Sequence, residues 1–415
     1  MLNLLLPQIK VFGTFSRILI RMKLLSYCLL FIGLVGCNLS ADKAENSVSV
    51  ATETEDAQLK SLSDRAIADL EKITFDSLKI PRTVEEGTMH GTPSKSWTSG
   101  FYPGMLWQLY GFSKDEKLRT AAEQCSAVVK KESLDGGTHD LGFKIYCPFG
   151  NAYRITKDEK YKEVFLTAAK TLSTRYNEKV GAIRSWDHHE HLWEFPVIID
   201  NMMNLEMLFE ATKQTGDSSF YHIADQHAKT TLKNHFREDN SSYHVIGYDP
   251  ETGAVTKKNT HQGLNHESAW SRGQAWGLYG YTATYRYTRN PKYLEQAQKI
   301  AEFIFNHPNL PEDLIPYWDY DAPNIPNEPR DVSAATITAS GLLELSTHDP
   351  ENASKYISWA KQILESLASE KYQYDIPPFF LKHSVGSIPG EFEMDAPIIY
   401  ADYYYVEALL RARDI

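Results

Sequence analysis

The chain alternates between two kinds of helical segment, and this alternation constrains the fold more than any other feature of the sequence. Segments such as KDEKLRTAAEQC, KDEKYKEVFLTAAK and GDSSFYHIADQHAK place Ala and aromatic residues at helical spacing beside a charged face. Segments such as FYPGMLWQLYG and WSRGQAWGLYGYTATYRY lie between them and are apolar or aromatic nearly all round. Because a helix that is apolar on every side must be buried, the sequence predicts buried inner helices within an outer layer of amphipathic ones.

The repeated pairing of one outer helix with one inner helix predicts an all-α fold, an (α/α)6 barrel of six helical hairpins. Strand-like alternation is rare along the chain. The twelve predicted helices cover residues 57–75, 100–111, 114–131, 143–155, 158–177, 197–213, 217–237, 268–287, 291–307, 333–347, 350–369 and 396–411.

If outer and inner helices alternate in direction, the N-termini of all six inner helices lie on one face of the barrel. The unusual polar and aromatic residues of the chain precede or open these inner helices. Six helix N-termini on one face would also favour a bound anion. The residues expected at this face are Trp97, His139, Asp140, Asp200, Ser271, Arg272, Asp331 and Asp395. We expect Asp331 and Asp395 to be simple helix caps.

The first 36 residues have the features of a secretory signal. They contain four basic residues, no acidic residue and an apolar run, Leu24–Val35, that is too short to span a membrane. Met22 is an alternative start that gives a signal of ordinary length. The run ends in Leu-Val-Gly-Cys, which resembles a bacterial lipobox with Cys37 as the lipid acceptor. We therefore expect residues 1–36 to be a signal peptide, 37–56 a lipidated Cys with a flexible polar tether, and 57–415 a single catalytic domain.

The charge balance of the chain argues against nucleic acid as a partner. The formal net charge is −11, and removal of residues 1–36 makes it −15. A small anionic substrate is not excluded, because it responds to the local field of a pocket. Only Cys125 and Cys147 remain in the folded part, where either one disulfide or two buried free thiols are compatible with export.

Two carboxylates, Asp140 and Asp200, are the candidate catalytic groups. Each precedes an inner helix, so each has an alternative interpretation as a helix N-cap. Both are expected on the same face beside Trp and His residues. Burial and mutual repulsion across a pocket raise the pKa of one carboxyl group, which can then donate a proton near neutrality.

Other residues of this face have competing interpretations. Arg272, in the first turn of a buried helix, needs an anionic partner, either a structural carboxylate or the carboxylate of a substrate. The segment HHEH, with His188, His189 and His191, matches no zinc-binding spacing, so it is interpreted as a polar loop. We predict neither a metal nor a cofactor.

Several motifs in consistent order resemble glycoside hydrolase family 88, the unsaturated glucuronyl hydrolases. They are SWTSGFYPGMLW, HDLGF, DNMMNLEML, YDPETG with THQG, and SRGQAWGLYGY. The resemblance runs from Trp97 to the C-terminus. It implies an (α/α)6 barrel that acts on di- and oligosaccharides carrying a Δ4,5-unsaturated uronic acid at the non-reducing end. It also implies that a carboxylic acid protonates C4 of the vinyl ether while water adds at C5.

The resemblance also implies roles for individual residues. Asp200 matches the general acid and base, and Asp140 matches the second essential carboxylate. Positions that contact the unsaturated uronate or stack on sugars are matched by His244, Gln262, Arg272, Trp276, Trp97 and Trp186.

The loop FLKHSVGSIPGEF resembles the family segment that contacts the next sugar. Some members have a Ser-x-x-Ser-x-Lys pattern there for a sulfate. Here Ser384 and Ser387 are present, Pro389 stands at the position of the Lys, and Lys382 is a candidate substitute. The resemblance therefore leaves the preference for sulfated chondroitin or heparin fragments open.

Two alternatives remain open at the level of sequence. An unsaturated rhamnogalacturonyl hydrolase would share the fold and mechanism but cut pectin fragments. A surface glycan-binding lipoprotein would also be anchored, aromatic-rich and acidic, but it needs no pair of converging Asp residues. The favoured interpretation is an exported, periplasmic or outer-membrane-anchored hydrolase of a Gram-negative bacterium, with a lipid anchor as its only membrane contact.

Overall fold

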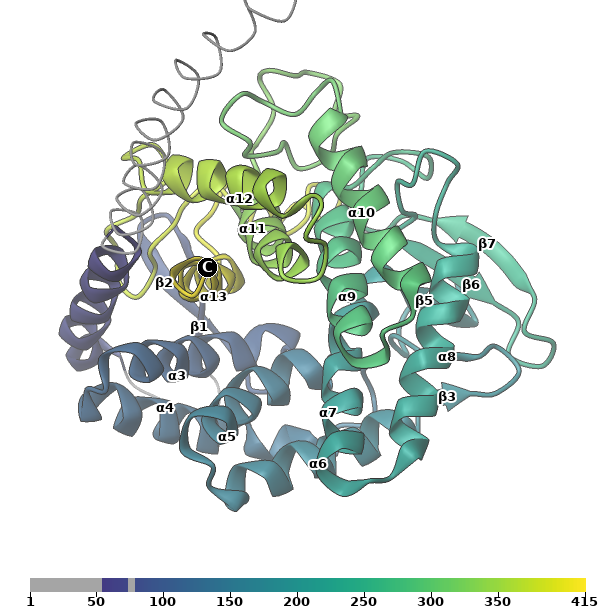
Figure 1. The fold of residues 1–415 in the computed structure, drawn as a ribbon, viewed down its shortest axis with the longest axis horizontal. Coiled ribbons are helices and arrows are strands. Elements are labelled where there is room, and N and C mark those ends of the chain that lie inside the picture. The colour runs from purple at the N-terminus through teal and green to yellow at the C-terminus, as the bar shows by residue number, and fades with distance from the viewer. Residues whose placement is uncertain (1–53, 74–78) are drawn as a thin grey trace, which may run out of the picture. The chain divides into compact units, whose positions relative to one another are not determined.

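Inner and outer helices follow one another along the chain in the order that the sequence predicts. A computed structural model describes residues 54–73 and 79–415, and twelve α-helical segments lie in these ranges. The predicted signal peptide and the lipid acceptor Cys37 lie outside the described residues. The colours in Figure 1 follow the helical pairs around a ring. The predicted (α/α)6 barrel is confirmed.

The outer helices begin where the sequence places a side-chain cap. After a first helical segment at residues 54–69, the outer helices are α4 (Glu116–Val129), α6 (Glu159–Ser173), α8 (Ser218–Asn234), α10 (Pro291–Asn306) and α12 (Ala353–Leu367). The Asp or Asn residue before each of α4, α6, α8 and α10 accepts a hydrogen bond from the second backbone N–H of its helix. This bond satisfies an amide that has no partner within the helix.

The inner helices form the closed ring. They are α3 (Phe101–Ser113), the π-helix Gly142–Gly150 continued by α5 (Asn151–Thr156), α7 (Leu205–Thr215), α9 (Ser271–Thr288), α11 (Val332–Ser346) and α13 (Ile399–Arg413). Every residue of α11 is buried. Helix α13 packs against both α11 and α3, and this contact closes the ring.

Three small antiparallel sheets were missed by the sequence analysis. They are β1 (Ile80–Glu85) with β2 (Thr88–Thr92), β3 (Tyr176–Asn177) with β4 (Ala182–Ile183), and β5 (Phe195–Ile198), β6 (Val245–Tyr248) and β7 (Val255–Asn259) in one sheet. The predicted helix 197–213 was therefore wrong at its start. The run Phe-Pro-Val-Ile is a buried strand because its β-branched residues pair with β6, and the helix proper begins at Leu205.

The beginnings of the inner helices differ in how they are capped. Asp331 caps α11 by accepting from the backbone N–H groups of Ser333 and Ala334, as predicted. Asp395 is not a cap, so that prediction was wrong. Helix α13 begins at Ile399, and Asp395 instead pairs with His383 Nδ1 at 2.7 Å.

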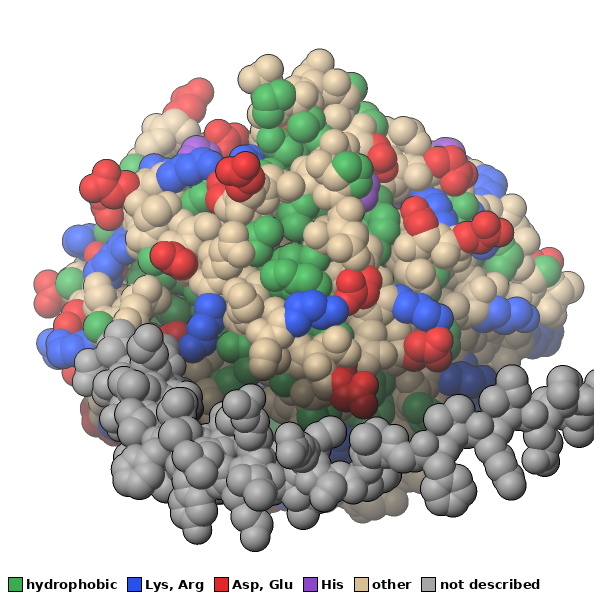
Figure 2. Space-filling view, turned by 45° about the horizontal axis from the view of Figure 1, so that its top comes forward, with side chains coloured by type: hydrophobic (Ala, Val, Ile, Leu, Met, Phe, Trp, Pro, Cys, Tyr) green, Lys and Arg blue, Asp and Glu red, His purple; other side chains and the backbone are tan. Residues whose placement is uncertain are grey.

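Cys125 and Cys147 are both buried free thiols, so the disulfide alternative is not realised. Burial raises the pKa of each thiol well above its ordinary value, which keeps both protonated. None of the helices in the described part of the chain is long and apolar enough to cross a membrane. On the face shown in Figure 2, acidic and basic side chains are interspersed.

Candidate active site

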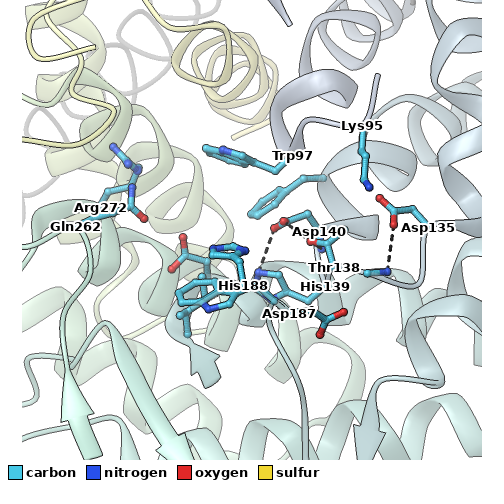
Figure 3. A pocket seen from close by; sticks show the side chains of 15 residues that line it. Lys95, Trp97, Asp135, Thr138, His139, Asp140, Asp187, His188, Gln262 and Arg272 are labelled. Carbon is cyan, nitrogen blue, oxygen red and sulfur yellow. Dashed lines mark hydrogen bonds and ion pairs between the residues drawn. The ribbon is translucent and has the colours of Figure 1, made fainter. Parts of the chain in front are cut away.

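A cavity of about 580 Å³ lies where the beginnings of four inner helical segments meet. Its lining includes both candidate carboxylates, two tryptophans and a buried arginine (Figure 3). The residues come from the turn before α3, the loop before the π-helix with the first turn of that helix, the β4–β5 loop, the β5–α7 junction, the β7–α9 loop and the start of α9. Segments more than one hundred residues apart in sequence therefore converge, as the helix alternation predicts.

Asp200 lies in the 3-10 turn Ile199–Asn204, between β5 and α7. Its side chain makes no capping hydrogen bond, so the N-cap interpretation is wrong for this residue. The carboxyl group is buried, and its Oδ2 atom has no hydrogen-bond partner. Burial raises the pKa of Asp200 to about 6, although the charges of His139 and Arg272 oppose the shift. A carboxyl group with this pKa is partly protonated near neutral pH and can act as a general acid.

His244 faces Asp200 from the adjacent strand region. The His244 Nδ1 atom accepts hydrogen bonds from the backbone N–H groups of His261 and Gln262, at 3.1 and 3.2 Å. Burial lowers the pKa of His244 well below its ordinary value, so the ring is neutral. Its single proton must then be on Nε2, which lies 3.7 Å from Asp200 Oδ2. An N–H of His244 therefore lies close to the acid, although no hydrogen bond joins the two groups.

Asp140 lies in the loop that precedes the π-helix, and three neighbours hold it in its charged form. Its Oδ2 accepts a hydrogen bond from Thr138 Oγ1 at 2.6 Å, and its Oδ1 lies 3.1 Å from His139 Nε2. Burial alone would raise the pKa of Asp140, but His139, Thr138 and the charge of Lys144 hold it below the ordinary value. Asp140 is thus ionised while Asp200 is partly protonated.

The two carboxyl groups therefore have different chemical capacities within one cavity. The negative charge of Asp140 contributes to the raised pKa of Asp200. Two carboxyl groups whose environments separate their pKa values are the usual basis for assigning an acid and its charged partner.

Arg272 pairs with a structural carboxylate, which was one of its two predicted partners, and it also lines the cavity. It is 1 % exposed, and its Nη1 atom lies 3.0 Å from Asp331 Oδ2. Its guanidinium also donates to the backbone carbonyls of Val385 and Gly386. The Nε atom is buried without a hydrogen-bond partner. Arg272 is thus a cation at the cavity wall that is held in place by Asp331.

The aromatic walls of the cavity come from Trp97 and Trp186. Trp97 packs edge-on against Phe101 and Phe143. Trp186 stacks on His188, with ring centroids 5.0 Å apart and an angle of 18° between the planes. Gln262 also lines the cavity, and its Nε2 donates to the Gly386 carbonyl at 3.0 Å.

Four predicted binding residues do not line this cavity: His244, which lies beside Asp200, and Trp276, Ser384 and Ser387. Trp276 is fully buried and packs between Phe143 and Tyr404, so it supports the cavity wall from behind. Ser384 exchanges backbone hydrogen bonds with Ala396, and the Ser387 hydroxyl accepts from Gly390 N–H. Both serines are buried within their own loop. The family resemblance identified their segments, but it could not determine which side chains reach the cavity.

Several lining residues were given no role by the sequence analysis: Lys95, Asp135, Thr138, Asp187 and His188. Thr138 and His188 lie next to predicted residues, so their neighbourhood was a usable signal. Lys95 and Asp135 carried no local signal, because a Lys in a polar turn and an Asp before two glycines are ordinary surface features. In the ranges 54–73 and 79–415, no group of three or more His, Cys, Asp or Glu side chains is arranged to hold a metal ion.

A ring of helical hairpins with a buried and a half-buried carboxyl group of different acidity, in one cavity with two tryptophans, is typical of a glycoside-processing (α/α)6 barrel enzyme. The pattern of Glycosyl Hydrolase Family 88 matches residues 77–321. The chain belongs to this family and is a glycoside hydrolase.

Individual relatives agree with this family. An unsaturated glucuronyl hydrolase of Formosa agariphila is 44% identical, over 95% of this chain and 99% of its own. A crystal structure of an unsaturated glucuronyl hydrolase specific for heparin is 46% identical, with a TM-score of 0.81, and the match covers 88% of this chain and 97% of that one. A variant of the Streptococcus agalactiae unsaturated glucuronyl hydrolase, solved in complex with dGlcA-GalNAc6S, is 28% identical with a TM-score of 0.73, over 87% and 93% of the two chains.

Proposed function

We propose that the enzyme releases the Δ4,5-unsaturated uronic acid from the non-reducing end of lyase-generated glycosaminoglycan oligosaccharides. The observation that carries this proposal is the buried Asp200 carboxyl group, with a pKa of about 6, in a tryptophan-walled cavity that also holds the ionised Asp140. Family membership and the names of the relatives support the same substrate class.

In the proposed first step, protonated Asp200 transfers its proton to C4 of the vinyl ether. The C4=C5 electron pair forms the new C–H bond, and the positive charge that develops at C5 is shared with the ring oxygen. The ionised Asp140 is placed to stabilise this charge and to hold the sugar hydroxyls.

In the second step, the Asp200 carboxylate removes a proton from the water that adds at C5. The N–H of His244 stabilises the carboxylate between the two steps. The resulting hemiketal opens to a keto-acid, and the bond to the next sugar breaks without direct attack at the anomeric carbon. The proton returned to Asp200 restores the acid for the next cycle.

This order of steps requires Asp200 to be protonated in the free enzyme. We therefore expect kcat/KM to fall as the pH rises through about 6, because burial raises the pKa of Asp200 to that value. A pH profile of kcat/KM measures this limb directly. A limb near the ordinary pKa of Asp would contradict the assignment of the proton donor.

The carboxylate of the uronic acid requires a cation in the cavity. Arg272 is the buried cation at its wall, its Nε atom has no hydrogen-bond partner, and Gln262 lines the same cavity. Asp331 offsets part of the positive charge, which holds the guanidinium in position before substrate binds. We assign the substrate carboxylate to Arg272 and Gln262.

We further propose that the enzyme is exported and anchored through Cys37, so that it acts in the periplasm or at the outer membrane. The basic N-terminal residues, the apolar run Leu24–Val35 and the Leu-Val-Gly-Cys sequence support this. A Cys37→Ser variant expressed in a Gram-negative host tests it. The wild-type protein should partition with membranes and the variant should not, whereas equal partitioning would contradict the anchor.

One assay tests the proposed reaction. The protein is incubated with unsaturated disaccharides made by heparin, chondroitin and pectin lyases, and the loss of ultraviolet absorbance from the conjugated C4=C5 bond is followed. We expect loss with glycosaminoglycan fragments and none with the Asp200→Asn variant. Activity only on pectin fragments would indicate a rhamnogalacturonyl hydrolase, and binding of glycans without any loss would indicate a glycan-binding protein.

A further inference from the structure

Lys95 lies on the side of the cavity away from Arg272 and Gln262. Figure 3 shows Trp97 and Asp140 between the two sides, with Lys95 next to Asp135. Lys95 and Arg272 are the lysine and arginine side chains of the cavity lining. A flat substrate in the cavity would thus have one cation on each side.

The backbone at Lys95 is fixed by its neighbours, while its side chain remains exposed. The preceding Ser94 donates from its Oγ atom to Glu132 at 2.6 Å and accepts at its carbonyl from Ser99 Oγ at 2.7 Å. The Lys95 carbonyl accepts a hydrogen bond from the buried ammonium group of Lys144 at 3.4 Å. The start of the side chain is therefore held at the rim, and its ammonium group is free to reach a ligand.

The acidic residues near Lys95 have other cations as close partners. Asp135 lies 2.6 Å from the ammonium group of Lys144, and Asp187 lies 2.9 Å from the guanidinium of Arg175. Lys95 itself makes no ion pair within residues 54–73 and 79–415, although its charge is a minor cause of the lowered pKa of Asp135. Its charge is therefore available on this wall, in contrast to that of Arg272, which has Asp331 as a partner.

We propose that Lys95 binds a sulfate group of the substrate and so determines a preference for sulfated fragments. This inference rests on the proposed function, which assigns the uronate carboxylate to Arg272. The other anionic groups of glycosaminoglycan fragments are sulfates. A lysine ammonium group is a mobile point charge that binds a tetrahedral anion without a fixed fork geometry. The sulfate is carried either by the unsaturated uronate or by the neighbouring amino sugar.

The structure favours Lys95 over the lysine suggested by the sequence. Lys382 precedes the Ser384–Ser387 segment, but it does not line the cavity. The two serine hydroxyls of that segment are buried within the loop. Lys95→Ala and Lys382→Ala each remove one positive charge, so they are a matched pair of variants.

The test compares Lys95→Ala, Lys95→Arg and Lys382→Ala in the full chain. The substrates are unsaturated disaccharides that are unsulfated, sulfated on the uronate, or sulfated on the amino sugar. The measured quantity is the kcat/KM for a sulfated substrate divided by the kcat/KM for the unsulfated one. For one of the sulfated substrates we expect Lys95→Ala to lower this ratio about tenfold, mainly through a higher KM. Lys95→Arg should restore most of the ratio, Lys382→Ala should not change it, and added salt should reduce the wild-type preference.

Binding to an Asp200→Asn background, measured by calorimetry, gives the same comparison without turnover. Equal loss on sulfated and unsulfated substrates would show a structural role for Lys95 and overturn the inference. No change in the ratio, or a selective loss only in Lys382→Ala, would also overturn it. If the wild-type enzyme leaves every unsaturated uronate intact, the proposed function fails instead, so the two failures are distinguishable.

Discussion

The barrel has a cavity at each end of its inner helices, and the two cavities differ in how their charges are paired. The cavity at the helix beginnings has a volume of about 580 Å³, and the one lined by residues of α3, the π-helix with α5, α7, α9 and α13 has about 610 Å³. At the first cavity, Asp200 Oδ2 and Arg272 Nε have no hydrogen-bond partner, and neither has His244 Nε2 beside Asp200.

At the second end, carboxylates and arginines neutralise one another. Arg286 lies 2.6 Å from Glu344 and 2.7 Å from Glu206, and Arg411 lies 2.9 Å from Glu344. Burial opposes ionisation of Glu344, but Arg286 and Arg411 hold its pKa well below the ordinary value. Arginines near helix C-termini also interact favourably with the helix dipoles. Size and charge content therefore do not distinguish the functional end; the direction in which the pKa of its buried carboxyl group is shifted does, raised for Asp200 and lowered for Glu344.

The largest expected effect is the loss of activity on substitution of Asp200 at the first end of the barrel. Asp200→Asn removes the proton donor, and kcat should fall by about a thousandfold while substrate binding is retained. Steady-state kinetics and calorimetric titration measure the two quantities. Asp217→Asn on the outer helix α8 is a matched control, because Asn also caps a helix. Near-wild-type turnover in Asp200→Asn would contradict the assignment.

A substitution at the second end of the barrel should lower stability and leave activity unchanged. Glu344→Gln leaves Arg286 and Arg411 without their shared charge, and the free energy of unfolding should fall by about 4 kcal/mol. Chemical denaturation measures this loss, and kcat/KM of the folded variant should equal that of the wild type. Exposed Glu365→Gln is the control. A large loss of kcat/KM in the folded variant would show that the second end contributes to catalysis.

The raised pKa of Asp200 also predicts a pH-dependent cost in stability. Below the unfolded pKa, both the folded and unfolded states are protonated. As the pH rises toward about 6, the unfolded state ionises first, so the folded state loses relative stability. Asp200→Asn removes this cost, and its stability advantage over the wild type should grow by about 2 kcal/mol between about pH 4 and about pH 7. Denaturation at both pH values measures it, and a constant difference would contradict the raised pKa.

The smallest expected effect concerns His244, whose Nε2 atom lies near Asp200 Oδ2 without a hydrogen bond between them. His244→Phe removes the N–H that faces the carboxyl group, so the carboxylate formed after proton transfer is less stable and kcat should fall about tenfold. The limb of the pH profile should move to higher pH, because the ionised form of Asp200 loses a donor. His222→Phe on the exposed side of α8 serves as the control. An unchanged pH limb would exclude His244 as the stabilising group.

Much of the fold was predictable from local patterns. The caps before α4, α6, α8 and α10, and the contrast between amphipathic and all-apolar segments, are encoded within short stretches of chain. The buried strand β5 was not predictable, because a run of apolar residues is compatible with a strand or a helix until its partner β6 is known. Trp276 was predicted to bind substrate because the motif that contains it could not show which face of α9 reaches the cavity.

The sequence by itself determined that the chain forms a barrel of alternating helices and that Asp140 and Asp200 lie at one end of it. Periodicity, capping residues and family motifs all act over short distances, so they can be read without the fold. Only the tertiary structure decided which groups surround each carboxyl group. Thr138 and His139 keep Asp140 ionised, whereas burial and the charge of Asp140 leave Asp200 partly protonated near neutral pH. The pKa of a carboxyl group depends on its burial and on charges within a few ångströms, and those neighbours are set by the packing of distant segments.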